Sequence, residues 1–193
     1  GTRLVVAKKT VIRDDNGKPQ HLLTVVDDVT ERRRTEQRIW YLAHNDSLTD
    51  LPNRATFVER LATELQEASK NGEQFAVLCI DLDRFKEAND IYGHQVGDTL
   101  LREAACRLRT AAGDAFLARV GGDEFTVIVG SGTQPAAAKA LSERLLAAFD
   151  DDFEIDGHKI QLSLSIGGAI YPSDGAAAKA FSRVSLAAAS SSP

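Results

Sequence analysis

The chain has 193 residues, 23 Lys and Arg against 28 Asp and Glu, a formal net charge of −5, and 43% hydrophobic residues. This length suits one complete domain and a fragment, and the ordinary apolar share excludes wholesale disorder, collagen-like repeats and a disulfide-built miniprotein. The negative charge speaks against binding of polymeric DNA or RNA, and the apolar run at residues 75–80 is far short of the roughly 20 residues that span a bilayer.

The first segment predicts a β-hairpin. Residues 4–13 and 21–27 are rich in strand formers, and turn-forming residues lie between them at 14–19. Because two strands alone are marginal in water, we expect the rest of this sheet upstream or on a partner. The start at Gly1-Thr2, without Met, likewise suggests a piece of a longer protein, with no membrane contact in this piece.

A charged connector helix is expected next. Thr30 is suited to cap a helix over residues 31–42, which is densely charged at its start and carries Ile39 and Trp40 near its end. Its charged surface fits a solvated face, but a short exposed helix between modules also fits pairing with its twin in a dimer. The sequence leaves both interpretations open.

A compact α/β pattern begins at Asp46. Asn53 is suited to cap a helix that Asn71-Gly72 ends. The core-facing stripe of this helix consists of Phe57, Leu61, Leu65 and Ala68. The unbroken apolar run at 75–80 predicts a strand buried on both faces, and the strand ends in Asp81-Leu82-Asp83.

Two helices separated by a break follow this strand. Residues 84–92 predict a short helix, Gly93-His94 break it, and Asp98 is suited to cap the next helix. The apolar stripe of that helix consists of Leu101, Ala105 and Leu108. Cys79 in the strand and Cys106 in this helix are expected to be buried, reduced thiols.

The second half predicts two hairpins and a helix. The segments are strands at 116–120 and 125–129 around a Gly121-Gly122 turn, a helix at 135–149, strands at 153–155 and 160–171 joined at Asp156-Gly157, and a tail at 176–193 that starts as a helix. Helices that alternate with strands, together with hairpins, predict an α+β fold. We expect a mostly antiparallel central sheet flanked by helices, of the ferredoxin-like type.

Acidic residues mark two corners of this predicted fold. They are Asp81 and Asp83 at the strand end and Asp123 and Glu124 in the hairpin. Asp83, directly before a helix, suits a helix cap better than a ligand, whereas Asp81 ends a rigid strand and suits a metal ligand. Gly121-Gly122 can form a tight turn or leave room for a ligand against backbone. Carboxylate ligands without His or Cys favour Mg²⁺ or Mn²⁺, whose coordination is usually completed by substrate phosphates and water. Lys86 is either a phosphate contact or a solvated lysine.

Residues 119–125, Arg-Val-Gly-Gly-Asp-Glu-Phe, resemble the signature of the GGDEF family of diguanylate cyclases, which join two GTP molecules into cyclic di-GMP. Further blocks that match the family in order lie at 46–54, 81–90, 93–98, 165–169 and 171–174. The resemblance implies a GGDEF domain at 46–193 with the nucleotide-cyclase-type fold. Residues 1–28 are similar to the last strands of a PAS sensor domain, and 29–45 to the signalling helix that follows such domains.

The resemblance also implies roles for individual residues. The metal ligands are expected to be Asp81, the carbonyl of Leu82, Asp123 and Glu124, with Asp123 and Glu124 as the catalytic pair. The substrate-binding residues are expected to be Phe85, Lys86, Asn89, His94, Asp98, Gly121 and Gly122. Glu124 would either ligate the metal or ease proton loss from the ribose 3′-OH. Asn89 and Asp98 would hold the guanine edge and disfavour adenine, and His94 would lie near the nucleoside or serve only the loop.

In this family each domain binds a single GTP, so the resemblance implies a homodimer. The 3′-OH of one GTP attacks the α-phosphate of the other, and Mg²⁺ or Mn²⁺ stabilises the nucleophile and the leaving group. An upstream sensor would act by changing how two connector helices pair. The need for GTP and the reduced thiols lead us to expect a cytoplasmic location.

Three positions depart from the family pattern. Ala112 and Ala115 stand where many relatives carry the Arg-x-x-Asp product-inhibition site, so no inhibitory site is expected. Asp50 replaces a customary Gly, and residues 189–193 lack the basic groups of the family's last helix. An alternative is a GTP-binding module that does not turn over and controls a neighbouring domain such as a cyclic di-GMP phosphodiesterase. A dimerising scaffold, the third possibility, leaves the residues for the guanine edge unexplained.

Overall fold

The computed structural model describes residues 2–130 and 132–174. The chain divides between Ala43 and His44 into two compact units, and each is described here by itself. Within the described residues, no helix is both long enough and apolar enough to cross a membrane.

The first unit contains a β-hairpin, as predicted. β1 (Val5–Arg13) and β2 (Pro19–Asp28) pair antiparallel. In the turn between them, the Asp14 carboxylate accepts hydrogen bonds from the amides of Asn16 and Lys18 at 3.0 and 2.8 Å. Large apolar side chains remain exposed on β2, and they include Leu22, Leu23, Val25 and Val26.

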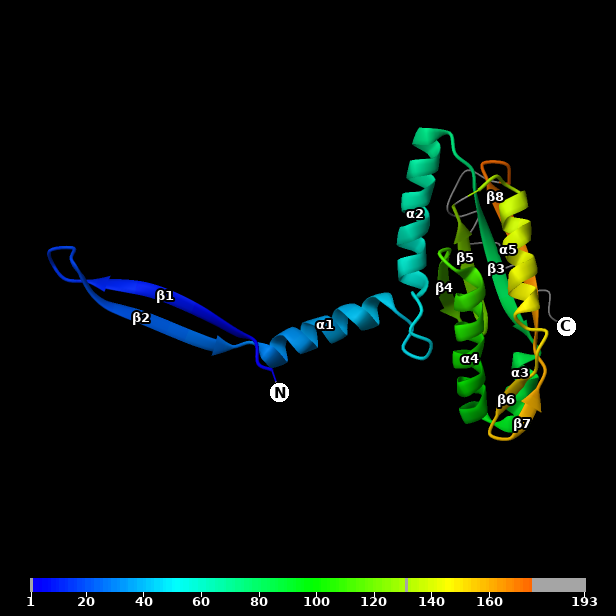
Figure 1. Cartoon of the computed structure of the whole chain (residues 1–193), viewed down its shortest axis with the longest axis horizontal. Coiled ribbons are helices and arrows are strands. Elements are labelled where there is room, and N and C mark those ends of the chain that lie inside the picture. The colour runs from blue at the N-terminus through cyan, green and yellow to red at the C-terminus, as the bar shows by residue number, and fades with distance from the viewer. Residues whose placement is uncertain (1, 131, 175–193) are drawn as a thin grey trace. The chain divides into compact units, whose positions relative to one another are not determined.

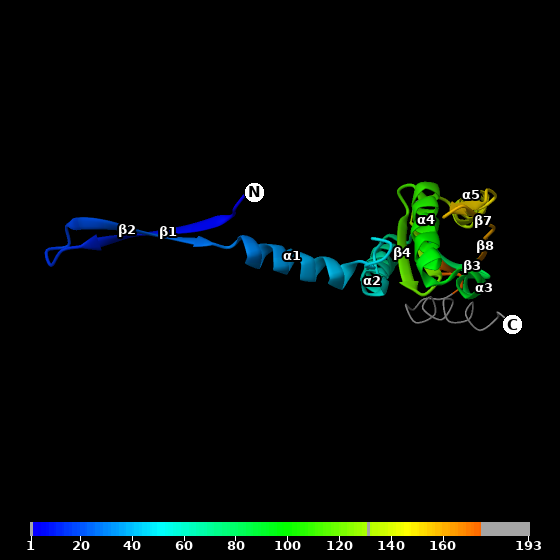
Figure 2. The ribbon, with the colours of Figure 1, turned by 90° about the horizontal axis from the view of Figure 1, so that it is seen from below.

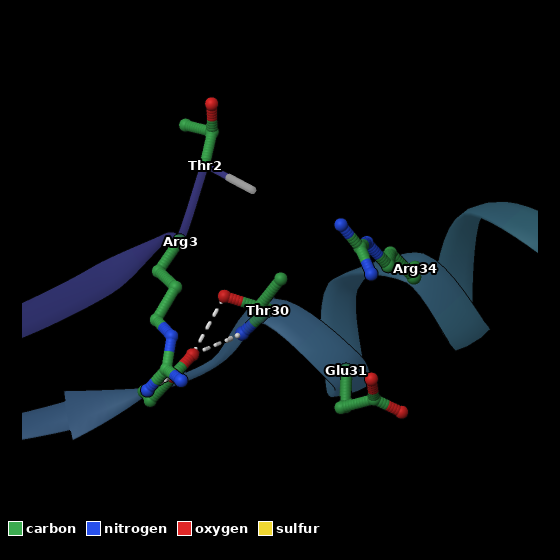
Figure 3. Close-up of a pocket in the computed structure, with 6 residues that line it drawn as sticks. Thr2, Arg3, Thr30, Glu31 and Arg34 are labelled. Carbon is green, nitrogen blue, oxygen red and sulfur yellow. Dashed lines mark hydrogen bonds and ion pairs between the residues drawn. The ribbon is translucent and has the colours of Figure 1, made fainter.

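Helix α1 (Thr30–His44) begins differently from the predicted Thr30 cap. Asp28 Oδ1 accepts hydrogen bonds from the backbone amide of Thr30 at 3.1 Å and from its hydroxyl at 2.6 Å (Figure 3). The Thr30 hydroxyl oxygen accepts a hydrogen bond from the Leu4 amide at 2.8 Å. Thr30 is therefore the first helical residue and Asp28 supplies the capping oxygen, which lowers the pKa of the Asp28 carboxyl.

The second unit is built on one four-stranded antiparallel sheet in the order β4-β5-β3-β8 (Figure 1). Its strands are β3 (Phe75–Asp83), β4 (Phe116–Gly121), β5 (Glu124–Val129) and β8 (Ser163–Tyr171). Its helices are α2 (Arg54–Asn71), α3 (Phe85–Tyr92), α4 (His94–Ala112) and α5 (Ala136–Ala147). A separate small hairpin pairs β6 (Phe153–Ile155) with β7 (His158–Ile160). The predicted α+β class, with an antiparallel central sheet flanked by helices, is confirmed.

β3 is buried on both faces of the sheet, as predicted. Phe75, Val77 and Cys79 pack in the cluster that contains α2, and Ala76, Leu78 and Ile80 pack in the cluster that contains α4 and α5. In Figure 2, α2 and α4 lie on opposite sides of β4, so the two helices cover opposite faces of the sheet. Because side chains alternate along a strand, Asp81 continues the face that α2 covers.

The predicted start of one helix is confirmed and that of another is wrong. The Asn53 side chain accepts a hydrogen bond from a first-turn amide of α2 at 3.1 Å, and Gly72 ends this helix with a φ of 69°. Helix α4 already begins at His94, so Asp98 lies one turn inside it and is not its cap. The residue before the helix is Gly93. Because glycine has no side chain to cap a helix, the sequence did not reveal this start.

Two further expectations are corrected. The single strand predicted at 160–171 is two strands, because the chain changes partner from β6 to β3 after β7. The Asp156-Gly157 turn is confirmed, with φ values of 50° and 81°. Cys79 is buried, but Cys106 is exposed because it lies on the outer face of α4. The prediction for the tail at 176–193 falls outside the described residues.

Candidate functional site

Carboxylates from two neighbouring strands meet near one end of the sheet. Asp81 of β3 lies directly across from Glu124, the first residue of β5. Asp123 precedes Glu124 in the turn between β4 and β5. On its other side, Asp81 lies across from Ser165 of β8. The antiparallel pairing of β3 with β5 therefore brings together the two acidic corners expected from the sequence.

The pKa of Asp81 reflects the proximity of these acids. The side chain is half-buried, and the pKa of Asp81 is raised to about 6 from an ordinary value of 3.8, with burial as the largest cause. The negative charges of Asp123 and Glu124 raise the pKa as well, followed by that of Asp83. A charge that is both desolvated and surrounded by like charges favours protonation or binding of a cation.

The turn that carries Asp123 is displaced by one residue from the predicted one. Because Gly121 pairs with Glu124, the turn consists of Gly122 and Asp123. The displacement follows from a shift in the strand register between Arg119 and Gly121. We call residues 121–124 the glycine turn. A Cβ atom added at Gly121 or Gly122 would meet no atom within 4 Å of the described structure, so the backbone here is open to a ligand.

Arg119 holds the glycine turn in place. Its Nε and Nη2 donate hydrogen bonds to the Gly122 carbonyl at 3.0 and 2.6 Å, and its Nη1 donates to Asp46 Oδ1 at 2.7 Å. Burial alone would raise the pKa of Asp46, but hydrogen bonds from Thr49 and Arg119 outweigh it and lower the pKa. Neither Arg119 nor Asp46 was expected from the sequence to be a site residue, although both belong to the matched blocks.

Asp83 is engaged with strand β8. Its carboxylate accepts hydrogen bonds from the Ser163 hydroxyl at 2.7 Å and from the Ser165 hydroxyl at 2.6 Å. The helix-cap role predicted for Asp83 is wrong, because Arg84 stands before α3 with a φ of 61° and no side chain caps that helix. Between the two acids, Leu82 turns its side chain into the core.

The remaining expected site residues lie on α3 and α4. Phe85, the first residue of α3, is buried. Asn89 is half-buried and packs against Gly97 of α4, where a Cβ atom would collide with the Asn89 side chain. The exposed members of this group are Lys86, His94 and Asp98. Gly97 was missed as a site residue, and only its position inside the matched block 93–98 could have drawn attention to it.

The chemistry of the acidic residues fits a hard divalent cation. Carboxylate oxygens are the ligands that Mg²⁺ and Mn²⁺ prefer, and the raised pKa of Asp81 reflects repulsion that such a cation would relieve. Within residues 2–130 and 132–174, no three His, Cys, Asp or Glu side chains are grouped closely enough to hold a metal ion by themselves. A Mg²⁺ ion here would therefore take further ligands from water and substrate phosphates, as this ion commonly does.

Comparisons with known proteins agree on one family. The family model described as "Diguanylate cyclase, GGDEF domain" matches residues 43–188. Diguanylate cyclase TpbB of Pseudomonas aeruginosa is 46% identical over 132 residues, which are 67% of this chain and 30% of the relative. Cyclic di-GMP phosphodiesterase PdeR of Escherichia coli is 35% identical over 185 residues, which are 95% of this chain and 28% of the relative.

A solved structure supports the same assignment. A truncated TpbB from Pseudomonas aeruginosa, comprising only the GGDEF domain, superposes with a TM-score of 0.71 at 39% identity. The match covers 77% of this chain and 90% of that chain. By contrast, this chain spans only 30% and 28% of the two curated relatives, so those relatives contain much more than the part that it resembles.

Proposed function

Because this chain belongs to the GGDEF family of diguanylate cyclase domains, we propose that it condenses two GTP molecules into cyclic di-GMP and releases pyrophosphate. The observation that carries the proposal is the pairing of Asp81 across from Glu124, with Asp123 beside them at the open glycine turn. Such a set of carboxylates supplies the hard oxygen ligands that suit a metal–triphosphate complex, whereas without the metal these carboxylates would repel the triphosphate.

The acids divide the work of the reaction. Asp81, Asp123 and the Leu82 carbonyl would hold Mg²⁺ or Mn²⁺ together with water and substrate phosphates, with Glu124 as a further ligand or as the proton acceptor. The cation would stabilise the negative charge on the α-phosphate and the leaving pyrophosphate. The 3′ oxygen of one GTP forms a bond to the α-phosphorus of the other, and the bond from that phosphorus to pyrophosphate breaks. Where Glu124 is not a metal ligand, it takes the proton of the 3′-OH, directly or through water.

Residues on α3 and α4 select and orient the nucleotide. Asp98 accepts hydrogen bonds from the guanine N1–H and amino group, which adenine does not match, and Asn89 holds the same edge. Lys86 and the backbone amides at the start of α3, beside Phe85, favour the triphosphate. His94 lies near the nucleoside, and Gly121 and Gly122 let the substrate approach the backbone of the glycine turn.

Catalysis requires two copies of the domain. Each copy brings one GTP, and the reacting groups meet only when two sites face each other. Residues 1–28, as the end of a PAS-like domain, and 29–45, as a signalling helix, would set how the copies pair. The GTP requirement places the reaction in the cytoplasm.

No product-inhibition site is proposed at the position where many relatives have one. Ala112 is buried and Ala115 is half-buried, and neither side chain can form an ion pair with the phosphates of cyclic di-GMP. Calorimetric titration with cyclic di-GMP should therefore show no tight binding. Tight binding that Asp114→Ala abolishes would refute this part of the proposal.

A regulatory module is the second candidate function. It is favoured by the relative PdeR, which is named a cyclic di-GMP phosphodiesterase and whose match extends over 95% of this chain. In this case the domain binds GTP without turnover and controls a neighbouring domain.

Incubation with GTP and Mg²⁺, followed by mass spectrometry of the products, separates the candidates. Formation of cyclic di-GMP that Asp123→Asn abolishes and Asp150→Asn, at an exposed acid, preserves would support the cyclase. GTP binding without product would support the regulatory module. Absence of both binding and product would leave only a scaffold.

A further inference from the structure

The backbone of the glycine turn has little intrinsic stiffness. Gly121 and Gly122 carry no side chains to pack, and Gly122 has a φ of +38°. The regular pairing of β4 with β5 is also shifted just before the turn. Asp123 follows directly, so the position of its carboxylate varies whenever the conformation of this backbone varies. A precise metal ligand at this position needs a restraint from outside the turn.

We propose that Arg119, held by Asp46, is a positioning residue for Asp123. Two nitrogens of the Arg119 guanidinium donate to the Gly122 carbonyl, and the third donates to Asp46. The side chain of Arg119 is only 10% exposed, so water competes little for its bond to Asp46, whereas the Gly122 carbonyl lies in an exposed turn. Because the Gly122 carbonyl belongs to the peptide plane that leads into Asp123, holding this oxygen orients Asp123.

Asp46 is itself held rigidly. Its Oδ1 accepts hydrogen bonds from the Thr49 amide at 2.9 Å and from the Thr49 hydroxyl at 2.8 Å. The Asp46 amide donates to the Leu51 carbonyl at 2.8 Å. A second contact joins the same loop to β4, since the Arg119 amide donates to the Pro52 carbonyl at 2.9 Å. These hydrogen bonds attach the loop at residues 45–53 to β4 and the glycine turn, so we expect the two segments to move together.

The other end of this loop is held at His44, the first residue of the second unit. The carbonyl of His44, the last residue of α1, accepts hydrogen bonds from the Asn53 amide at 2.9 Å and from the Thr56 hydroxyl at 2.7 Å. These two hydrogen bonds attach His44 to the loop at residues 45–53 and the start of α2.

Rigid placement of Asp123 should affect the reaction step more than nucleotide binding. The residues proposed for guanine recognition lie on α3 and α4, and none of the hydrogen bonds of Arg119 or Asp46 given above involves those helices. This catalytic consequence rests on the proposed cyclase function, whereas the fastening of the turn does not.

The test compares Arg119→Lys and Asp46→Asn with a matched control. Arg107→Lys serves as the control, because Arg107 also donates to backbone carbonyls, those of Ala148, Asp151 and Asp152, but away from the acids. Hydrogen exchange at residues 121–125 and the steady-state kcat and KM for GTP are measured for all variants. Circular dichroism fixes the folded fraction of each.

We expect Arg119→Lys and Asp46→Asn to speed exchange at 121–125 and to lower kcat by about 10- to 100-fold, with KM changed less than about threefold. Arg107→Lys should loosen only residues 148–153, which include the Phe153 ring beneath its guanidinium. Unchanged exchange in Asp46→Asn, a loss expressed in KM, or a loss equal to the unfolded fraction would overturn the proposal. If the wild-type protein forms no product, the cyclase function fails, and exchange alone decides whether Arg119 and Asp46 hold the turn.

Discussion

Ionised Asp81 costs the fold stability when no cation is bound. Burial and neighbouring acids raise its pKa to about 6, above the ordinary 3.8 of an unfolded chain. The folded state therefore holds the proton more tightly than the unfolded state. The contribution to stability is fully present below about pH 4 and is lost as the pH rises through 6. At neutral pH the acids are held close together against their mutual repulsion, as expected of residues kept for a ligand.

Asp81→Asn should consequently stabilise the metal-free protein at neutral pH. In EDTA at pH 7.5 we expect the free energy of unfolding to rise by on the order of 1 kcal/mol after allowance for solvent screening. The gain should vanish below about pH 4. Urea unfolding at several pH values measures it, with Asp150→Asn as the exposed control. A variant less stable than wild type at pH 7.5 would show that Asp81 is not under electrostatic strain.

A substitution at Gly121 is expected to affect substrate binding without affecting the stability of the fold. A Cβ atom there meets no atom of the described structure within 4 Å, and Gly121 is not among the glycines with positive φ. Gly121→Ala should change the free energy of unfolding by less than about 0.5 kcal/mol. It should still weaken GTP binding, which calorimetry measures, because the methyl group occupies space proposed for substrate. Unchanged GTP affinity would mean that substrate does not approach this backbone.

At the scale of secondary structure, local signals predicted the elements and missed their long-range contacts. The apolar run of β3 and the Asn53 cap lie within a few residues of what they determine. The partners of Asp83, Ser163 and Ser165, are set by the register of β8 on β3, which spacing along the chain does not reveal. The contact of Arg119 with Asp46 spans 73 residues and is invisible for the same reason.

The start of α2 offers a test at this scale. Asn53→Ala removes the side chain that accepts a first-turn amide, so the free energy of unfolding should fall by about 1 kcal/mol. Asn71→Ala, at the other end of the same helix, is the matched control and should change it by less than about 0.5 kcal/mol. Equal unfolding free energies for the two variants in urea would show that the Asn53 side chain does not stabilise the start of α2.

At the scale of the whole molecule, the site belongs entirely to the second unit. The sheet of that unit places the three acids, and the loop at 45–53 connects the glycine turn to His44, the first residue of the same unit. The family's block order predicted which residues belong together, but the sequence could not give the distance between the two acidic corners. The proposed chemistry therefore depends on whether these acids bind one divalent cation jointly.

Cation binding can be measured directly with Mn²⁺ and a GTP analogue that cannot be cleaved between the α and β phosphorus atoms. Electron paramagnetic resonance counts the free Mn²⁺ in titrations of the wild-type protein, Asp81→Asn, Asp123→Asn and the control Asp150→Asn. We predict that each of the first two variants weakens Mn²⁺ binding by at least about tenfold while the control binds like the wild type. Equal Mn²⁺ affinity in all four proteins would contradict a cation site shared by β3 and the glycine turn.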